Sequence, residues 1–84
     1  MLSETIDEGL GRYEIGRRIR ELRQTKTLGL VELGAHTGLS PGMLSRIETG
    51  RLFPTLPTLL RIAMVFGVGL DHFFTPDRQR PLRE

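Results

Sequence analysis

LGLVELGAHTGLSPGMLSRIETG, residues 28–50, reads as two short helices joined by a tight turn. In its first half, Leu30 and Leu33 recur at helical spacing, with the small Gly34 beside them. Gly38 follows, and glycine can end a helix at low steric cost because it adopts a left-handed backbone. The first half therefore predicts a helix that ends at Gly38.

The second half carries the signals of another helix. Ser40 is a natural N-cap, and Pro41 suits the first helical position because its missing N–H is not needed there. Leu44 and Ile47 give this helix a buried stripe, and Gly50 ends it. One surface of the helix is left free to enter a groove.

Helices are also predicted on both sides of this pair. One spans residues 13–24, and its inward-facing residues are Ile15, Ile19 and Leu22. Another spans 56–66, with Thr55 as its cap and Gly67 at its end. Its apolar face is expected to contain Leu56, Leu59, Leu60, Ala63 and Phe66. A last short helix is expected over residues 70–74.

The two ends of the chain differ from this central part. Residues 1–12 are predicted to be an N-terminal extension that forms a frayed or short extra helix, because Gly9, Gly11 and Gly16 weaken helical structure. Residues 13–75 form the predicted domain, and the polar residues 76–84 look like a tail or linker.

Composition limits the classes of function. A chain of 84 residues can bury one modest core, which leaves no room for a separate catalytic domain. It contains no cysteine, so disulfides and thiolate metal ligands are excluded. There is no run of about eighteen apolar residues that could span a membrane and no signal-peptide pattern at the start. We expect a soluble cytoplasmic protein.

Charge is unevenly distributed. The net charge is +2, but residues 1–14 hold four acids against Arg12, while residues 15–84 hold eleven bases against six acids. This asymmetry favours a polyanionic partner, although a solvated basic face would look the same.

At this point the chain resembles a family, the Cro-like (Xre) helix-turn-helix repressors, over residues 15–74. The matching pieces are Glu32-Leu33, Thr37-Gly38-Leu39-Ser40-Pro41, Leu44-Ser45-Arg46-Ile47-Glu48, Gly50-Arg51, Pro54-Thr55-Leu56 and Leu59-Leu60-Arg61-Ile62-Ala63. The resemblance implies an all-α, compact five-helix domain that binds operator DNA. The segment Ser40 to Ser45, with the proline and arginine-containing tail, also resembles the N-terminal domain of regulators with a downstream cupin-type sensor.

In this family the N-terminal part of the second helix faces the base edges in the major groove. Here that implies a recognition helix at about 41–49, with Pro41, Gly42 and Arg46 toward the bases. Arg46 is the one of these three that can make paired hydrogen bonds to guanine, and its alternative role is an ion pair with a neighbouring carboxylate. Gly42 either allows close approach to DNA or is simply tolerated in a first turn. Met43 either contacts a thymine methyl group or fills the core.

Other residues are predicted to hold phosphate groups. Ser40, Ser45 and Thr49 offer hydroxyl groups beside the groove face, and Arg51 follows the helix. Backbone N–H groups near Gly29 and Leu30 would form a positive helix end suited to phosphate. The family often has a polar residue where this chain has Leu30, so only the backbone is expected to make that contact.

Several polar residues are expected to do no chemistry. Arg23 and Glu48 match the family positions that form a structural ion pair. His36 and His72 lack a ligand-spaced companion, so no metal site is predicted. No catalytic set or cofactor motif is present, and we expect neither enzyme activity nor a cofactor.

Three functions are consistent with these features. The favoured one is sequence-specific binding of double-stranded DNA by a transcriptional regulator associated with the nucleoid, acting as a homodimer. An antitoxin-type protein that binds a toxin and its own operator is the alternative, and a protein-only adaptor is the third. For the dimer, we expect one of Phe73 and Phe74 to pack inward and the other to join a symmetric contact.

Overall fold

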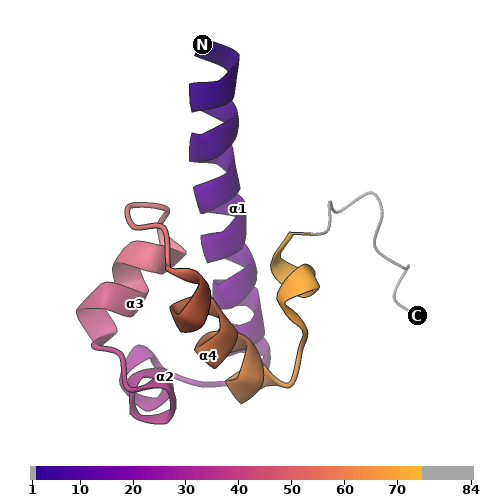
Figure 1. Ribbon diagram of the computed structural model, residues 1–84. Helices are drawn as coiled ribbons and strands as arrows, with labels where there is room; N and C mark the ends of the chain where they lie inside the picture. The colour runs from indigo at the N-terminus through magenta and orange to yellow at the C-terminus, as the bar shows by residue number, and fades with distance from the viewer. Residues whose placement is uncertain (1, 75–84) are drawn as a thin grey trace.

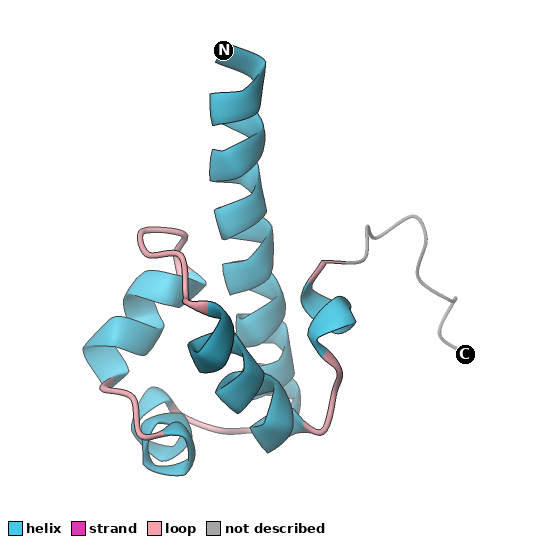
Figure 2. Ribbon diagram, viewed as in Figure 1, coloured by secondary structure: helices cyan, strands magenta, loops and turns pink. Residues whose placement is uncertain are grey.

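Residues 2–74 are described by the computed structural model, and within the first helix side chains are described at Gly11 and from Glu14 onward. This part of the chain forms four α-helices and one 3-10 helix, arranged as in Figure 1. They are α1 (Leu2–Thr25), α2 (Leu30–Thr37), α3 (Pro41–Glu48), α4 (Leu56–Phe66) and η1 (Leu70–Phe73). No strand occurs between residues 2 and 74 (Figure 2), so the predicted all-α class is confirmed.

The last helix is of the 3-10 type. A short helix is predicted over residues 70–74, and the structure has a four-residue 3-10 helix there, η1. Such tight turns are common where only a few residues connect to a packed core. None of the helices in the described segment is long and apolar enough to cross a bilayer. The predicted tail at residues 76–84 lies outside the described residues.

The N-terminal helix also differs from the prediction. A frayed or short helix was expected before a separate helix over 13–24, but α1 runs without a break from Leu2 to Thr25. Its N-terminal part projects beyond the other helices (Figure 1). The glycines that weakened the helical pattern lie inside α1, and one of them, Gly16, is buried against α3. A Cβ atom at Gly16 would overlap the carbonyl oxygen of Ile47 and lie 2.6 Å from that of Glu48. The sequence therefore gives up helix propensity at Gly16 for close contact between α1 and α3.

The core is made by one stripe from each helix. Its buried apolar residues are Ile15, Ile19, Leu33, Leu44, Ile47, Leu59, Ile62, Ala63, Phe66 and Phe73. On α4 the prediction was partly wrong, because Leu56 and Leu60 are exposed and Ile62 is buried instead. The buried face of α4 follows the helical spacing i, i+3, i+4, i+7 from Leu59, which leaves Leu56 and Leu60 on its flank.

Candidate nucleic-acid interface

The turn between α2 and α3 is fixed by backbone geometry and by one buried hydroxyl group. Gly38 has φ of 78°, a left-handed conformation that ends α2. A Cβ atom at Gly34 would lie 2.5 Å from the carbonyl oxygen of Leu39, so the turn closes directly over this glycine. The Thr37 hydroxyl donates to the Leu33 carbonyl at 2.8 Å and accepts from the Leu39 N–H at 3.3 Å. The angle between the two helices is thus determined by contacts internal to the turn.

Arg61 ties this turn to α4. Its guanidinium, on Nη1, donates to the carbonyl oxygen of Thr37 at 3.3 Å, at the C-terminal end of α2. A cation at this end of a helix is favourable, because the unpaired carbonyl groups there carry partial negative charge. Sequence reasoning missed the roles of Thr37 and Arg61. For Thr37 a local signal existed, since a threonine at the end of a helix often bonds the carbonyl four residues earlier.

Both ends of α3 are capped. The Ser40 hydroxyl oxygen accepts from the Met43 N–H at 3.1 Å, and Pro41 occupies the first helical position. After the helix, Gly50 has φ of 79°, and the Arg51 N–H donates to the Arg46 carbonyl at 2.9 Å. This bond across the left-handed glycine closes the last turn, so α3 is a rigid two-turn helix.

The side chains of α3 divide cleanly between core and solvent. Leu44, Ile47 and Glu48 are buried. At about 100° per residue, the direction opposite to these three residues is occupied by Gly42, Arg46 and Thr49, all exposed. We call these three residues the α3 ridge.

The residues predicted to read bases lie in different environments. Pro41, Gly42 and Arg46 are exposed, and no hydrogen bond or ion pair with another described side chain restrains Arg46. A Cβ atom at Gly42 would have no neighbour within 4 Å. Met43 is half-buried and packs against the core, so its thioether contributes to packing whatever else it contacts.

The side chains predicted to hold phosphate differ in how far they are already hydrogen-bonded or buried. The Thr49 hydroxyl donates to the carbonyl of Ser45 at 2.9 Å, whereas Arg51 is exposed just past the helix. The Ser40 oxygen is engaged as the α3 cap and Ser45 is half-buried. These hydroxyl groups can still accept or donate a second bond, but Arg51 is the one charged group among them.

At the predicted phosphate site, the start of α2, one backbone N–H group is paired within the protein. The Gly29 N–H donates to the Glu32 carboxylate at 2.8 Å, and the Leu30 side chain is half-buried against the core. A carboxylate three residues into a helix is a standard partner for the N-cap N–H, and its negative charge already satisfies the positive helix end. The Gly29 N–H is thus already paired with Glu32, and phosphate binding at this helix end stays a prediction.

An ion pair fastens α3 to α1. Arg23 donates from Nε to Glu48 Oε2 at 2.7 Å and from Nη2 to Oε1 at 3.0 Å, which is a two-point fork. It also donates from Nη1 to the Leu28 carbonyl at 2.9 Å. The hydrogen bond to Glu48 raises the pKa of Arg23 above its ordinary value, against the opposing effect of burial. The fold thus brings Arg23 and Glu48 together, and their charges pair with each other and hold α3 against α1.

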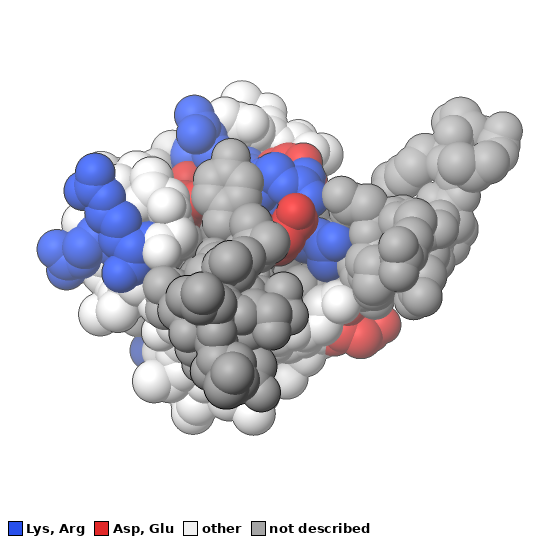
Figure 3. All heavy atoms as spheres, turned by 90° about the horizontal axis from the view of Figure 1, so that it is seen from above, with Lys and Arg blue, Asp and Glu red and all other residues white. Residues whose placement is uncertain are grey.

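Basic residues gather on the side of the molecule where α3 lies. Figure 3 shows Lys and Arg atoms grouped at the left edge, which is the α3 side in Figure 1. The exposed arginines of α3 and the following loop are Arg46 and Arg51, and α3 carries no acid on its exposed face because Glu48 is buried. This surface would attract an anion rather than a cation.

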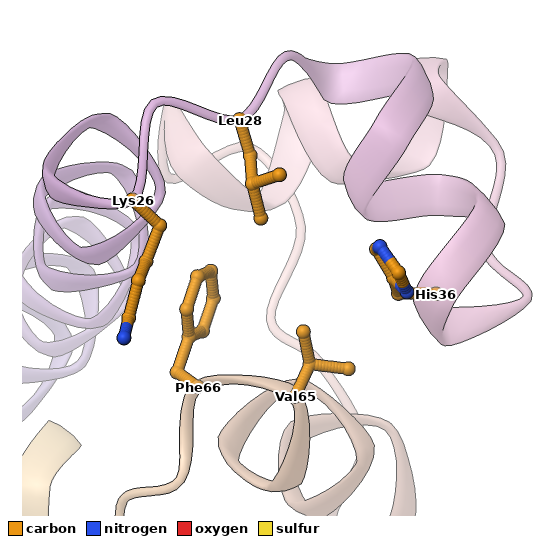
Figure 4. A pocket seen from close by; sticks show the side chains of 5 residues that line it. All are labelled: Lys26, Leu28, His36, Val65 and Phe66. Atoms are coloured by element: carbon orange, nitrogen blue, oxygen red, sulfur yellow. The ribbon is translucent and has the colours of Figure 1, made fainter.

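A shallow hollow lies elsewhere, between the end of α1, α2 and α4. It has a volume of about 360 Å³ and is lined by Lys26, Leu28, His36, Val65 and Phe66 (Figure 4). Its lining holds one imidazole and no carboxylate, and no cluster of metal-ligating side chains was found among the described residues. The hollow does not involve the α3 ridge.

Comparison with known proteins places this geometry in a family. A family model described as "Helix-turn-helix domain" matches residues 14–73. The chain is 33% identical over 69 residues to the HTH-type transcriptional regulator PuuR of Escherichia coli, covering 82% of this chain and 36% of PuuR. It is 36% identical over 67 residues to the uncharacterized HTH-type transcriptional regulator y4dJ of Sinorhizobium fredii, covering 80% of this chain and 87% of y4dJ. The chain thus spans about a third of the length of PuuR.

Solved structures of helix-turn-helix proteins resemble this fold. The restriction-modification controller protein C.AhdI from Aeromonas hydrophila superposes with a TM-score of 0.71 at 27% identity, covering 74% of this chain and 94% of C.AhdI. An HTH_3 family transcriptional regulator from Vibrio cholerae superposes with a TM-score of 0.77 at 32% identity, covering 86% of this chain and 40% of that protein. With the family match over 14–73, these likenesses show that the chain belongs to the helix-turn-helix domain family, of the Cro-like (Xre) type.

Proposed function

We propose that this protein regulates transcription by binding a specific double-stranded DNA operator, with α3 in the major groove. The observation that carries the proposal is the α3 ridge, which is exposed opposite the buried stripe and free of acidic side chains. A rigid helix with these properties fits the width and charge of the major groove. The names of PuuR and y4dJ, both HTH-type transcriptional regulators, support the same assignment.

Within this proposal, Arg46 reads a guanine through its forked guanidinium, and Pro41 and Gly42 lie against neighbouring base edges. Met43 adds at most an edge contact, because its side chain is half-buried. Arg51 neutralises a phosphate, with Ser40, Ser45 and Thr49 as hydroxyl partners. Residues 13–75 would be the DNA-binding unit, with 1–12 as an extension and 76–84 as a linker. This assignment includes no enzymatic step or cofactor, and it places the protein in the cytoplasm with the nucleoid.

We also propose that two copies act together. Phe73 is buried, whereas Phe74 is 52% exposed at the end of η1. A second apolar group, Leu56, Leu60 and Met64, is exposed along α4 at i, i+4, i+8 spacing. Two half-sites bound by a symmetric pair would multiply the few base pairs that one short helix can read. The toxin partner and the downstream sensor stay predictions of the sequence, since no contact in residues 2–74 bears on them.

The direct test is to select duplexes from a randomised library with the purified protein. An enriched motif of two inverted half-sites, protected from cleavage by the protein, is the expected result. Enrichment of no motif, with equal affinity for every duplex, would contradict sequence-specific binding.

A further inference from the structure

Glycine is unfavourable inside a helix, so we expect a physical reason for each glycine within or next to a described helix. For Gly16 and Gly34 the reason is packing, because a Cβ atom would press against backbone carbonyl groups. For Gly38, Gly50 and Gly67 it is a left-handed backbone. Gly29 and Gly69 precede helices as N-caps.

Gly42 has none of these reasons. It lies in the first turn of α3, does not have a positive φ, and a Cβ atom there would meet nothing within 4 Å. Gly11, inside α1, is the other described glycine within a helix that has open space around its missing Cβ. Neither the fold nor the packing of the described residues requires glycine at position 42.

What separates Gly42 from Gly11 is its place. The buried residues Leu44, Ile47 and Glu48 point to one side of α3, and Gly42 lies at the middle of the opposite side, in line with Arg46 one turn later. Because Gly42 has no side chain and Arg46 has a long one, the α3 ridge extends least far from the helix axis at its N-terminal end. Any body that contacts the whole ridge must come closer to the backbone at Gly42 than at Arg46.

Resting on the proposed function, we infer that Gly42 is a specificity-determining residue that accepts the methyl group of a thymine. The first turn of the ridge presents the exposed Pro41 ring and the bare Cα atom of Gly42, and neither residue has a side chain able to hydrogen-bond a base edge; the polar side chains of Ser45 and Arg46 follow one turn later. The C5-methyl of thymine is the apolar group that base pairs present in the major groove. A side chain at position 42 would occupy the space that this methyl fills, so glycine is required by the partner.

The test compares Gly42→Ala with wild type on a duplex that wild type has selected from a randomised library. Each thymine of the duplex is replaced in turn by deoxyuridine, which lacks only the methyl group. At one thymine in each half-site, the replacement should weaken wild-type binding about fourfold, the affinity that burial of one methyl group supplies. Gly42→Ala should bind the unmodified duplex about tenfold more weakly or worse, the usual cost of one disrupted base contact. On the deoxyuridine duplex it should recover most of that loss, because the alanine methyl then fills the vacated space.

Gly11→Ala is the matched control, since it adds the same methyl group to a helix at a position with equal space. Both variants should keep or raise the Tm, and Gly11→Ala should bind both duplexes as wild type does. Equal affinity of Gly42→Ala and wild type for the selected duplex would overturn the inference while leaving DNA binding intact. An equal loss on the thymine and deoxyuridine duplexes would also overturn it, because the clash would then lie with the DNA backbone. If wild type selects no sequence, the proposed function itself fails.

Discussion

The ion pair between Arg23 and Glu48 holds α3 against α1. The side chain of Glu48 is 5% exposed and that of Arg23 14% exposed, so each charge depends on the other for its solvation. Removal of Arg23 would leave a buried carboxylate on the helix proposed to read DNA. Arg17, which is partly exposed and pairs with the more exposed Glu14 and Glu21 on α1, lacks this dependence.

We predict that Arg23→Ala lowers the free energy of unfolding by about 3 to 5 kcal/mol, the usual cost of breaking a buried pair. Arg17→Ala should cost less than about 1 kcal/mol, as exposed pairs do. Urea denaturation of both variants measures the difference. The double variant Arg23→Met/Glu48→Leu should be more stable than Arg23→Ala, since it buries no lone charge. Similar losses for Arg23→Ala and Arg17→Ala would contradict the account of this pair.

Some of these residue roles could be read from the sequence and others could not. The Arg23 and Glu48 pairing followed from the family resemblance, because 24 intervening residues separate them and no local pattern links them. The bond between Gly29 and Glu32 is readable from the sequence, since an acid at the third helical position is a local capping signal. The contact of Arg61 with Thr37 depends on how α4 packs against α2, and the chain order alone does not specify that packing.

The contact between α1 and α3 illustrates the same limit for helices. The sequence predicted where α2, α3 and α4 begin and end, because caps and glycines are local signals. It did not predict that α1 continues to Leu2, since the glycines in this stretch lower its helix propensity. Gly16 is explained only by the neighbouring carbonyl groups of α3, which are distant in sequence.

We predict opposite effects for alanine at two positions in α1. Gly16→Ala should destabilise the protein by about 1 to 3 kcal/mol, because the added methyl group overpacks the α1–α3 contact. Gly11→Ala should stabilise it by about 0.4 to 1 kcal/mol, since its surroundings are open and alanine favours the helix. Thermal unfolding of the two variants measures these changes in stability. Stabilisation by both substitutions would show that α1 and α3 are not in close contact at Gly16.

Beyond the single chain, the exposed apolar residues bear on assembly. Leu56, Leu60, Met64 and Phe74 are each about half exposed or more. If full burial of such a side chain removes about 100 Å² from water, they contribute a few hundred Å² of apolar surface per copy, whereas a standard interface buries roughly 800 Å² of apolar and polar surface together per partner. We expect binding to adjacent half-sites to strengthen the proposed dimer.

We predict that Phe74→Ser weakens self-association and binding to a two-half-site duplex while the Tm stays close to that of wild type. Phe73→Ser should instead unfold the protein, because Phe73 is buried in the core. Sedimentation equilibrium with and without duplex measures the association. Phe53→Ser is the control, since Phe53 is 47% exposed but lies outside α4 and η1. A monomer both free and on a palindromic duplex would rule out the dimer.

The measurement that bears most directly on DNA reading by α3 is a set of binding curves at fixed salt for wild type, Arg46→Ala and Arg51→Ala. The duplexes are the selected operator, its single-base variants and random DNA. Arg46→Ala should lose about 1 to 3 kcal/mol on the operator and lose its preference at one G·C pair, because the guanidinium fork to guanine is gone. On random DNA its loss should be much smaller. Arg51→Ala should weaken binding to all duplexes by a similar factor and lower the salt slope by about one unit, as a phosphate contact does.

This pattern, loss of preference at one base pair for Arg46 and uniform loss for Arg51, is the predicted result. Equal losses for Arg46→Ala on operator, variants and random DNA would contradict base reading through the α3 ridge.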